Sequence, residues 1–373
     1  MKKIIVIGSG ILGASTAYYL AKSGTKVIIA DRQDSGQATD AAAGIVAPWL
    51  SKRRNQAWYK LAKGGARIYQ DLIQELAGDG ETDTGYARVG AINLQTDDEK
   101  LIAMKEHAIK RREDAPEIGE ITLLDQKQSK EMFPLLSDKY AALHISGAAR
   151  VDGRALRNAL LRAAVKHGTK ITQGNARLLF EGTQITGVSI NGEKIKADQV
   201  IAATGAWTSQ LLKPLDMQFD VRAQRAQIVH LRMPGVTPEN WPVVKPPINQ
   251  YMLSFHDRIV VGATHENHVG FDNRVTAGGL KFILSNAIET APALEDASII
   301  ETRVGFRPMT PESVPVIGKL PGFDGLLLAN GLGSSGLTTG PYVGKQLANL
   351  ALDEELDIDL ANYDMSRLIK PLN

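Results

Sequence analysis

Three glycines near the start of the chain have the spacing of a dinucleotide-binding turn. Gly8, Gly10 and Gly13 follow a short apolar run, and a second apolar run, residues 26–30, ends at Asp31. In such a turn the first glycine allows a tight bend, the second lets the backbone approach a pyrophosphate, and the third lets a helix pack on a strand. The acid would accept hydrogen bonds from a ribose 2′-hydroxyl. The pattern predicts FAD or NAD rather than NADP, because a carboxylate repels a 2′-phosphate.

The elements around these glycines agree with that prediction. Residues 3–7 are typical of a strand, residues 14–23 of a helix and residues 26–31 of a second strand. Two other interpretations are a glycine-rich turn without a ligand and a signal peptide, since Met1-Lys2-Lys3 precedes apolar residues. Glycines inside the apolar stretch and the lack of a small-residue cleavage site argue against a signal peptide.

A second glycine turn lies near the other end of the chain. Residues 331–336 follow an apolar strand and precede a predicted helix over about 338–352. A helix N-terminus stabilises negative charge, and a reduced flavin carries such charge on its N1–C2=O edge. This turn favours FAD over NAD, although a turn with only a packing role remains an alternative. The strand-and-glycine segments at Gly8, Gly205 and Gly331 are predicted to share one sheet on either side of an inserted domain.

Composition limits the class of protein. The chain has 373 residues, 43% of them hydrophobic and 23% charged, which suggests two domains. A net charge of +2 gives no reason to expect nucleic acid. The absence of cysteine excludes disulfides, thiolate metal sites and a flavin tethered through cysteine, and no metal site is expected. No apolar run reaches the roughly 18 residues of a membrane span, so we expect no transmembrane segment and a cytoplasmic protein.

Hydrophobic periodicity predicts a mixed middle region. Helices are expected over about 58–76, 97–112, 125–133 and 153–167, and strands over 85–94, 226–231, 251–255, 258–263 and 297–307. The predicted fold class is α/β plus α+β, with a Rossmann-type FAD-binding domain interleaved with a mixed-sheet substrate-binding domain. The FAD-binding domain is assigned residues 1–80, 146–216 and 303–373, and the substrate-binding domain residues 81–145 and 217–302.

Several short motifs occur in the order found in one flavoprotein family. They are residues 6–13, Ala41-Ala42-Ala43-Gly44-Ile45, Val151-Asp152-Gly153-Arg154, Ala203-Thr204-Gly205-Ala206-Trp207, residues 258–264, residues 305–311 with 315–318, and the C-terminal glycine turn. This order resembles the D-amino-acid oxidase superfamily, and most closely its glycine oxidase branch. The matching motifs extend over nearly the whole chain.

The resemblance implies a non-covalent FAD and residues that hold it. The adenosine and phosphate half would be held by Gly8, Gly10, Ile11, Leu12, Gly13, Asp31, Arg32 and Ala176. The phosphates and flavin ring would be lined by Ala38, Thr39, Ala43, Gly44 and Ile45. The pyrimidine edge of the flavin would be covered by Leu332, Gly333, Ser334, Ser335, Gly336, Leu337 and Thr338, and further cofactor-binding residues would be Thr204, Gly205 and Trp207. The run 41–44, taken alone, is equally typical of an Ala-rich helix start.

The resemblance also implies catalytic residues. Arg307 matches the arginine that binds the substrate carboxylate, and a guanidinium fork suits a planar carboxylate. Tyr251 matches a tyrosine near the substrate. Without the resemblance, Arg307 is equally a salt-bridging strand residue and Tyr251 a strand aromatic.

Three departures from the glycine oxidase pattern concern the substrate. Ser334 stands where that branch has a second arginine, Ala226 where the family usually has glycine, and His265 follows a segment where a methionine lines the pocket. His265 would then face the substrate, with Glu266 and His268 nearby, or all three are exposed hairpin residues. These differences leave room for a larger or more polar amino acid than glycine.

The expected activity is FAD-dependent oxidative deamination of a D-amino acid, glycine or an N-methylated amino acid. Hydride would pass from the α-carbon to flavin N5, and the imine would hydrolyse to an oxo acid. The expected partners are a small amino acid with a free carboxylate and either dioxygen or an electron carrier, and a homo-oligomer is possible. The alternatives are a 2-hydroxy-acid or amine dehydrogenase that passes electrons to a quinone, a non-catalytic FAD-stabilised subunit and, least favoured, an NAD-dependent dehydrogenase.

Overall fold

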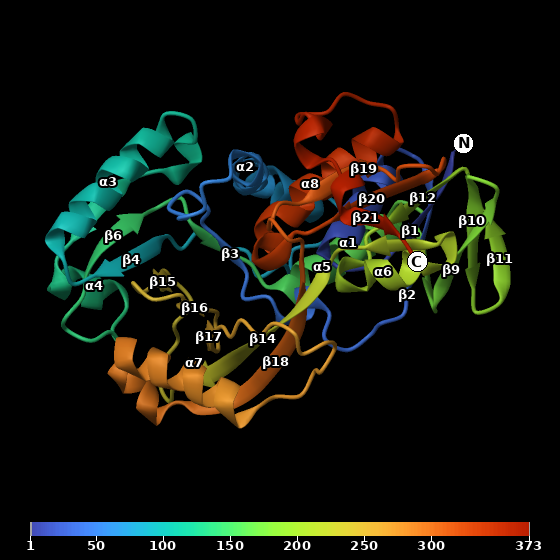
Figure 1. Ribbon diagram of the computed structural model, residues 1–373. Helices are drawn as coiled ribbons and strands as arrows, with labels where there is room; N and C mark the ends of the chain where they lie inside the picture. The colour runs from blue at the N-terminus through green and yellow to red at the C-terminus, as the bar shows by residue number, and fades with distance from the viewer. Residues whose placement is uncertain (1, 373) are drawn as a thin grey trace.

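Two β-sheets organise the chain. The computed structural model describes residues 2–372, and Figure 1 shows one sheet in each of two lobes. The first sheet has the order β19-β20-β12-β1-β2-β8. Its strands are β1 (Lys3–Ile7), β2 (Lys26–Asp31), β8 (Lys170–Gln173), β12 (Gln199–Ala202), β19 (Val316–Lys319) and β20 (Leu326–Asn330). All neighbours are parallel except β19 and β20, so the three predicted glycine turns follow strands of one sheet, as expected.

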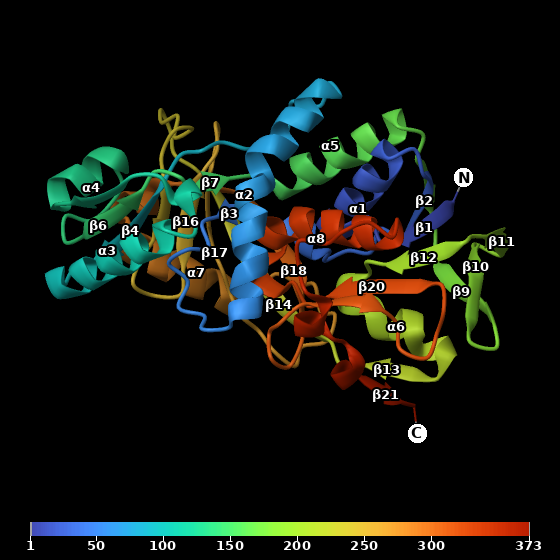
Figure 2. The same cartoon turned by 90° about the horizontal axis from the view of Figure 1, so that it is seen from above.

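This first sheet is buried on both faces, which explains its continuous apolar strands. Ile4 and Val6 pack in one core with α1 (Ile11–Lys22), α2 (Gln56–Gly78) and α8 (Gly336–Ala351), while α5 (Gly153–Lys166) covers α1. Figure 2 shows α1, α5 and α8 side by side. Ile5 and Ile7 face the opposite core, formed with β9 (Ala176–Glu181), β10 (Gln184–Ile190) and α6 (Thr208–Leu212). β11 (Glu193–Lys196) completes that small sheet.

The second sheet is mixed and has eight strands in the order β18-β14-β17-β16-β15-β4-β6-β5. They are β4 (Ala91–Gln95), β5 (Ile121–Leu124), β6 (Ala141–Ile145), β14 (Arg222–Arg232), β15 (Val243–Lys245), β16 (Tyr251–Ser254), β17 (Ile259–Gly262) and β18 (Ser298–Met309). α3 (Asp98–Arg112), α4 (Gln126–Met132) and α7 (Ala277–Thr290) complete this lobe. The long strands β14 and β18 reach the other lobe, where Phe306 N–H donates to Gly36 O at 2.9 Å.

Smaller elements connect these layers. They are the 3₁₀ turn η1 (Ala38–Ala41) and the strands β3 (Ile45–Val46), β7 (Ala149–Arg150), β13 (Met217–Phe219) and β21 (Ile369–Pro371). β3 pairs with β7, and β13 pairs with β21.

The predicted α/β plus α+β fold class is confirmed, and the expected helices form. Their N-caps are side chains that accept a backbone N–H, among them Asn55, Asp97, Asp125 and Asp152. The strand predicted over 85–94 is confirmed only in its C-terminal part, because the strand observed there is Ala91–Gln95. Gly85 and Gly90 have φ of 65° and 74°, a left-handed conformation that interrupts a strand.

The domain boundaries remain a proposal, since β18 crosses the one placed at residue 303. Within residues 2–372, none of the helices combines the length and apolarity needed to cross a membrane.

Candidate functional site

Two adjoining cavities lie at the carboxyl ends of the first sheet, where parallel α/β sheets bind ligands. Cavity A, of about 430 Å³, is lined by the turns after β1, β2 and β12 and by residues 174–177. Cavity B, of about 410 Å³, extends from those turns to the turn after β20 and the second sheet. The residues that line both are Gly10, Ala203, Gly205 and Trp207. The two cavities therefore meet at the glycine turn and suit the two halves of an extended ligand.

Two fingerprint glycines are required by the protein's own packing. Gly8 has φ of 102°, and a Cβ there would lie 2.5 Å from Ala203 O. A Cβ on Gly13 would lie 1.9 Å from Gly8 O, so α1 could not approach β1 as it does. Gly13 lies behind the turn and does not line either cavity.

Gly10, unlike Gly8 and Gly13, is not required by the packing of the protein and therefore bears on whether FAD fits the site. Its φ of −63° is open to any residue, and the nearest atom to an added Cβ is Thr39 Oγ1 at 3.3 Å. Protein packing does not demand a glycine here, but Gly10 lies where cavities A and B meet. It is also the N-cap of α1 and provides no side chain to the N–H groups behind it. Open space beside a helix N-terminus suits the pyrophosphate of a dinucleotide.

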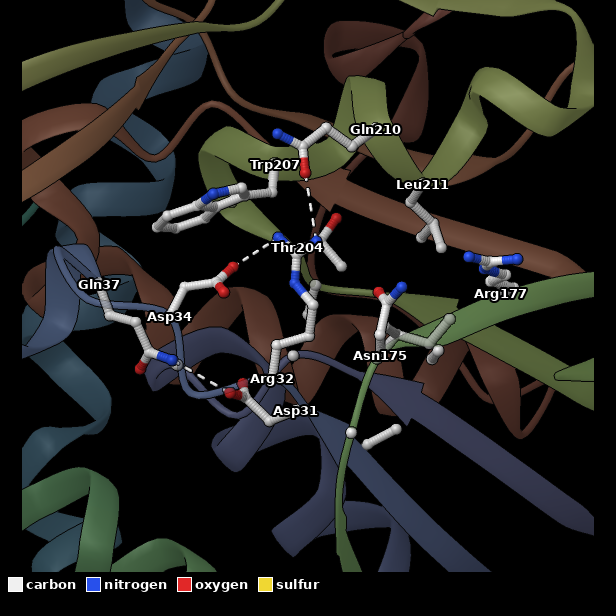
Figure 3. Close-up of a pocket in the computed structure, with 18 of the residues that line it drawn as sticks. Asp31, Arg32, Asp34, Gln37, Asn175, Arg177, Thr204, Trp207, Gln210 and Leu211 are labelled. Carbon is white, nitrogen blue, oxygen red and sulfur yellow. Dashed lines mark hydrogen bonds and ion pairs between the residues drawn. The ribbon is translucent and has the colours of Figure 1, made fainter. Parts of the chain in front are cut away.

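Asp31 holds the glycine turn in place. Its Oδ2 accepts the Ser9 N–H at 2.6 Å, and its Oδ1 accepts the Gln33 N–H at 2.5 Å. Oδ1 also accepts Gln37 Nε2 at 3.1 Å (Figure 3). Arg32 pairs with Asp34 at 2.5 Å and extends across cavity A toward Gln210. The acid that sequence assigned to the ribose is therefore also a structural part of the turn.

The other predicted cofactor residues line the cavities. Cavity A contains Gly8, Asp31, Arg32, Ala176 and Thr204, and cavity B contains Ile11, Leu12, Ala38, Thr39, Ala43, Gly44, Ile45, Leu332, Gly333, Ser334, Ser335, Gly336, Leu337 and Thr338. The run 41–44 is not a helix start beyond η1. The chain becomes extended at Ala42, and a Cβ on Gly44 would lie 1.7 Å from Val151 O.

The N-terminus of α8 points at cavity B, where it can stabilise negative charge. Thr338 Oγ1 donates to Ile45 O at 2.8 Å and joins this helix to the wall of small residues. Asn330 Nδ2 donates to Gly205 O at 2.8 Å and joins the turns after β20 and β12. The cavity is thus held by contacts between elements that are far apart in the sequence.

Arg307 lies at the far side of cavity B and is 9% exposed. Its Nη1 donates to Gln224 Oε1 at 3.1 Å, to Thr264 O at 3.2 Å and to His265 Nδ1 at 2.7 Å. These are its hydrogen bonds within residues 2–372, where it forms no ion pair with an acid. Burial lowers the pKa of Arg307, and Tyr251 opposes that shift. A buried cation without a partner anion is costly, so this site favours an anionic ligand.

Tyr251 and His265 border the same guanidinium. Burial raises the pKa of Tyr251, so its phenol is neutral. A Cβ on Gly262, which lies opposite Tyr251, would be 3.0 Å from the phenol oxygen, so glycine leaves room for that ring. His265 is an exposed residue, but desolvation of its ring together with the nearby Arg307 lowers its pKa to about 4. A neutral ring fits its role as hydrogen-bond acceptor from Arg307.

Two neighbours named with His265 do not join the site. The Glu266 carboxylate turns away to Arg225, at 2.6 Å, and to Gln227, at 2.7 Å. His268 is exposed and does not line cavity B. Among these three residues, only His265 lies at the cavity.

Comparison with known proteins decides the family. Residues 3–350 match the family described as DAO, FAD dependent oxidoreductase. The chain belongs to this family. It is 57% identical over 366 residues to the uncharacterized oxidoreductase YurR of Bacillus subtilis (strain 168), with 98% of each chain covered. It is 30% identical to a glycine oxidase of Pseudomonas aeruginosa, with 97% of this chain and 98% of the relative covered.

Solved structures agree with the fold of this oxidoreductase. The iminodiacetate oxidase of Chelativorans sp. BNC1 superposes with a TM-score of 0.94 at 43% identity, with 97% of this chain and 98% of the other covered. A glycine oxidase from Geobacillus kaustophilus gives a TM-score of 0.86 at 26% identity, with 98% and 99% covered. The glycine oxidase-like resemblance and the FAD dependence expected from the sequence are confirmed.

The oxidoreductase has two further cations in cavity B that sequence reasoning missed. Arg53 stacks over the Trp58 ring, 4.8 Å from its centroid, and donates to Ser334 Oγ at 3.1 Å. Lys245 Nζ donates to Ala47 O at 2.8 Å, and burial lowers the pKa of this lysine to about 8. Arg53 lies in the run Lys52-Arg53-Arg54, which is typical of a solvated surface, and no spacing in the sequence marks Lys245.

Proposed function

We propose that the enzyme oxidises the C–N bond of a small amino acid and that Arg307 binds the substrate carboxylate. The observation that carries this proposal is a buried guanidinium that has no partner acid among residues 2–372, in the same cavity as the N-terminus of α8. Glycine and iminodiacetate, the substrates named for its relatives, both carry an amine one carbon from a carboxylate. A D-amino acid, glycine or an N-substituted amino acid fits this description.

The chain's own residues position the substrate. The free side of the Arg307 fork pairs with a carboxylate, and the neutral Tyr251 phenol is available beside it to donate a hydrogen bond. His265, as a neutral acceptor, fixes the guanidinium through Nη1. Bound FAD supplies the hydride acceptor. Fixed geometry of this kind removes much of the entropic barrier to the transfer.

The charge of cavity B favours a neutral amine. Its described lining contains Arg53, Lys245 and Arg307 but neither Asp nor Glu. Nearby cations lower the pKa of a bound amine, so the proton of the substrate ammonium is released without a carboxylate base. The neutral amine has the lone pair that drives loss of hydride, and the resulting imine then hydrolyses to an oxo acid.

Anaerobic reduction of the purified yellow enzyme tests this proposal. Flavin absorbance is followed after addition of glycine, sarcosine, iminodiacetate, D-alanine or D-aspartate, with glycolate and D-lactate as 2-hydroxy-acid controls. Bleaching by at least one amino compound and not by the hydroxy acids is expected. Bleaching only by hydroxy acids, or by none of the compounds, would refute the proposal.

The electron acceptor is tested separately. An oxygen electrode measures whether reduced enzyme makes peroxide from dioxygen, and a quinone dye measures transfer to a carrier. Dioxygen or a carrier, a homo-oligomer and a cytoplasmic location stay predictions.

A further inference from the structure

We propose that the substrate of this enzyme carries a second carboxylate, held by Lys245 and Arg53, while Arg307 holds the first. This inference rests on the proposed function and names its substrate class as dicarboxylic amino acids. The second acid group could sit on the nitrogen substituent, as in iminodiacetate, or on the side chain, as in D-aspartate. The same chemistry recognises both.

The first argument is charge. Three cations line cavity B and no Asp or Glu does, within the described residues. Arg53 lies close enough to Arg307 to lower the pKa of the latter, so these cations repel one another. A monocarboxylic amino acid with a neutral amine brings one negative charge, whereas a dicarboxylic one brings two. Cations that share a desolvated site are stabilised most by the ligand that supplies the larger opposite charge.

The second argument is position across the sheet. Val244 pairs with Met252 in antiparallel register, so Lys245 lies opposite Tyr251 on the next strand. Arg307 lies on the outermost strand, β18, where it pairs with Gln224 of β14. The order β18-β14-β17-β16-β15 separates the strands of Arg307 and Lys245 by four spacings, or roughly 19 Å of backbone. Both residues nevertheless line cavity B, so the sheet holds two cations at separate places on the wall of one cavity.

The third argument concerns Arg53, which comes from the other lobe. It lies in the segment between β3 and α2, and Trp58 and Ser334 fix its guanidinium at the wall formed by the glycine turn. A segment far from β15 and β18 in the sequence therefore supplies the third cation of cavity B.

Lys245 has no role that the protein itself explains. Its only hydrogen-bond partner within residues 2–372 is the carbonyl oxygen of Ala47, and it forms no ion pair there. An ammonium of this kind retains donors for a ligand, because each lysine has three N–H groups. Tyr251 lies between Lys245 and Gly262 in the register of the sheet, and this row continues through Ile228 to Arg303, four residues before Arg307 on β18.

Matched substrate pairs test the inference in the holoenzyme. Iminodiacetate and sarcosine differ by one carboxylate, as do D-aspartate and D-alanine. In the wild type, the kcat/KM of anaerobic flavin reduction should be at least tenfold higher for one dicarboxylic member than for its partner. The pair that shows the larger ratio identifies where the second carboxylate sits.

Variants locate the second carboxylate. Lys245→Met should lower kcat/KM for the dicarboxylic substrate about 10- to 100-fold more than for its monocarboxylic partner, because only the dicarboxylic substrate loses a charge-assisted contact. The effect of the lost positive charge on the pKa of the amine is common to both substrates and cancels in this ratio. Arg53→Met should act in the same direction. Arg54→Met, in which an exposed arginine is removed, is the control and should change neither value.

A second readout does not depend on turnover. Titration with succinate and acetate, followed by the flavin absorbance change, gives dissociation constants for a di- and a monocarboxylate. Lys245→Met should weaken succinate by at least tenfold and acetate by little. Equal losses for both members of each pair, or wild-type preference for the monocarboxylic members, would overturn the second carboxylate and leave the proposed function standing. Failure of every amino compound to reduce the flavin would instead refute the proposed function.

Discussion

The Arg307→Met substitution tests the part of the site on which the proposed reaction most depends. It removes the guanidinium but keeps an unbranched side chain of similar length in the buried position. Truncating one partner of a buried, hydrogen-bonded charge pair costs about 2–5 kcal/mol. That energy corresponds to roughly 30- to 5,000-fold in kcat/KM. Because Lys245 and Arg53 still attract the substrate, we expect the lower part of this range, about 100-fold.

The assay is single-turnover anaerobic flavin reduction over a range of substrate concentrations, which separates binding from the hydride step. The loss should be mainly in the apparent dissociation constant, and flavin content and circular dichroism should equal those of the wild type. Arg307→Lys keeps the charge but loses the fork, so its value should lie between wild type and Arg307→Met. Unchanged kcat/KM in Arg307→Met would refute the carboxylate role, and so would a loss fully explained by missing FAD.

Three further outcomes follow from the structure. Gly10→Ala should fold normally but retain at least tenfold less FAD after dialysis. Gly13→Ala should instead destabilise the fold, since its Cβ would lie 1.9 Å from Gly8 O. Flavin content and thermal melts distinguish the two variants, and equal melting temperatures would contradict the close packing inferred at Gly13. Asp31→Ala should weaken FAD retention because it removes both the proposed hydrogen-bond partner of the ribose and the acceptor of the Ser9 N–H in the glycine turn. Unchanged flavin content after dialysis would contradict this role of Asp31. His265 has a pKa lowered to about 4, so the unfolded chain binds more protons than the native one between about pH 4 and 6.5, and stability rises with pH there. His265→Gln should therefore show a smaller fall in melting temperature from pH 7 to pH 5 than wild type, and a fall as large as that of wild type would contradict it.

Much of the fold could be predicted because its signals are local. The glycine turns at Gly8 and Gly331 and the helices expected over 97–112 and 153–167 depend on a few neighbouring residues, and each was predicted. The first part of the strand expected over 85–94 does not form, because a glycine with positive φ at residue 90 interrupts it, and composition alone does not show φ.

The candidate site could be predicted only where a motif marks it. Arg307, Tyr251 and His265 were reached through family resemblance, and all three line cavity B. Arg53 and Lys245 were not reached, because each stands in a stretch whose composition is typical of a surface loop or a strand end.

The sequence by itself determined that a dinucleotide binds at residues 8–31, since glycine spacing, helix start and acid act over a few turns of chain. It also determined the order of strands and glycine turns that forms the first sheet. Only the tertiary structure decided the charge of the substrate cavity. Arg53, Lys245 and Arg307 lie far apart along the chain, and they meet because β14 and β18 join the two lobes and β15 lies four strand spacings from β18. Long-range packing sets this convergence, so no local pattern records it.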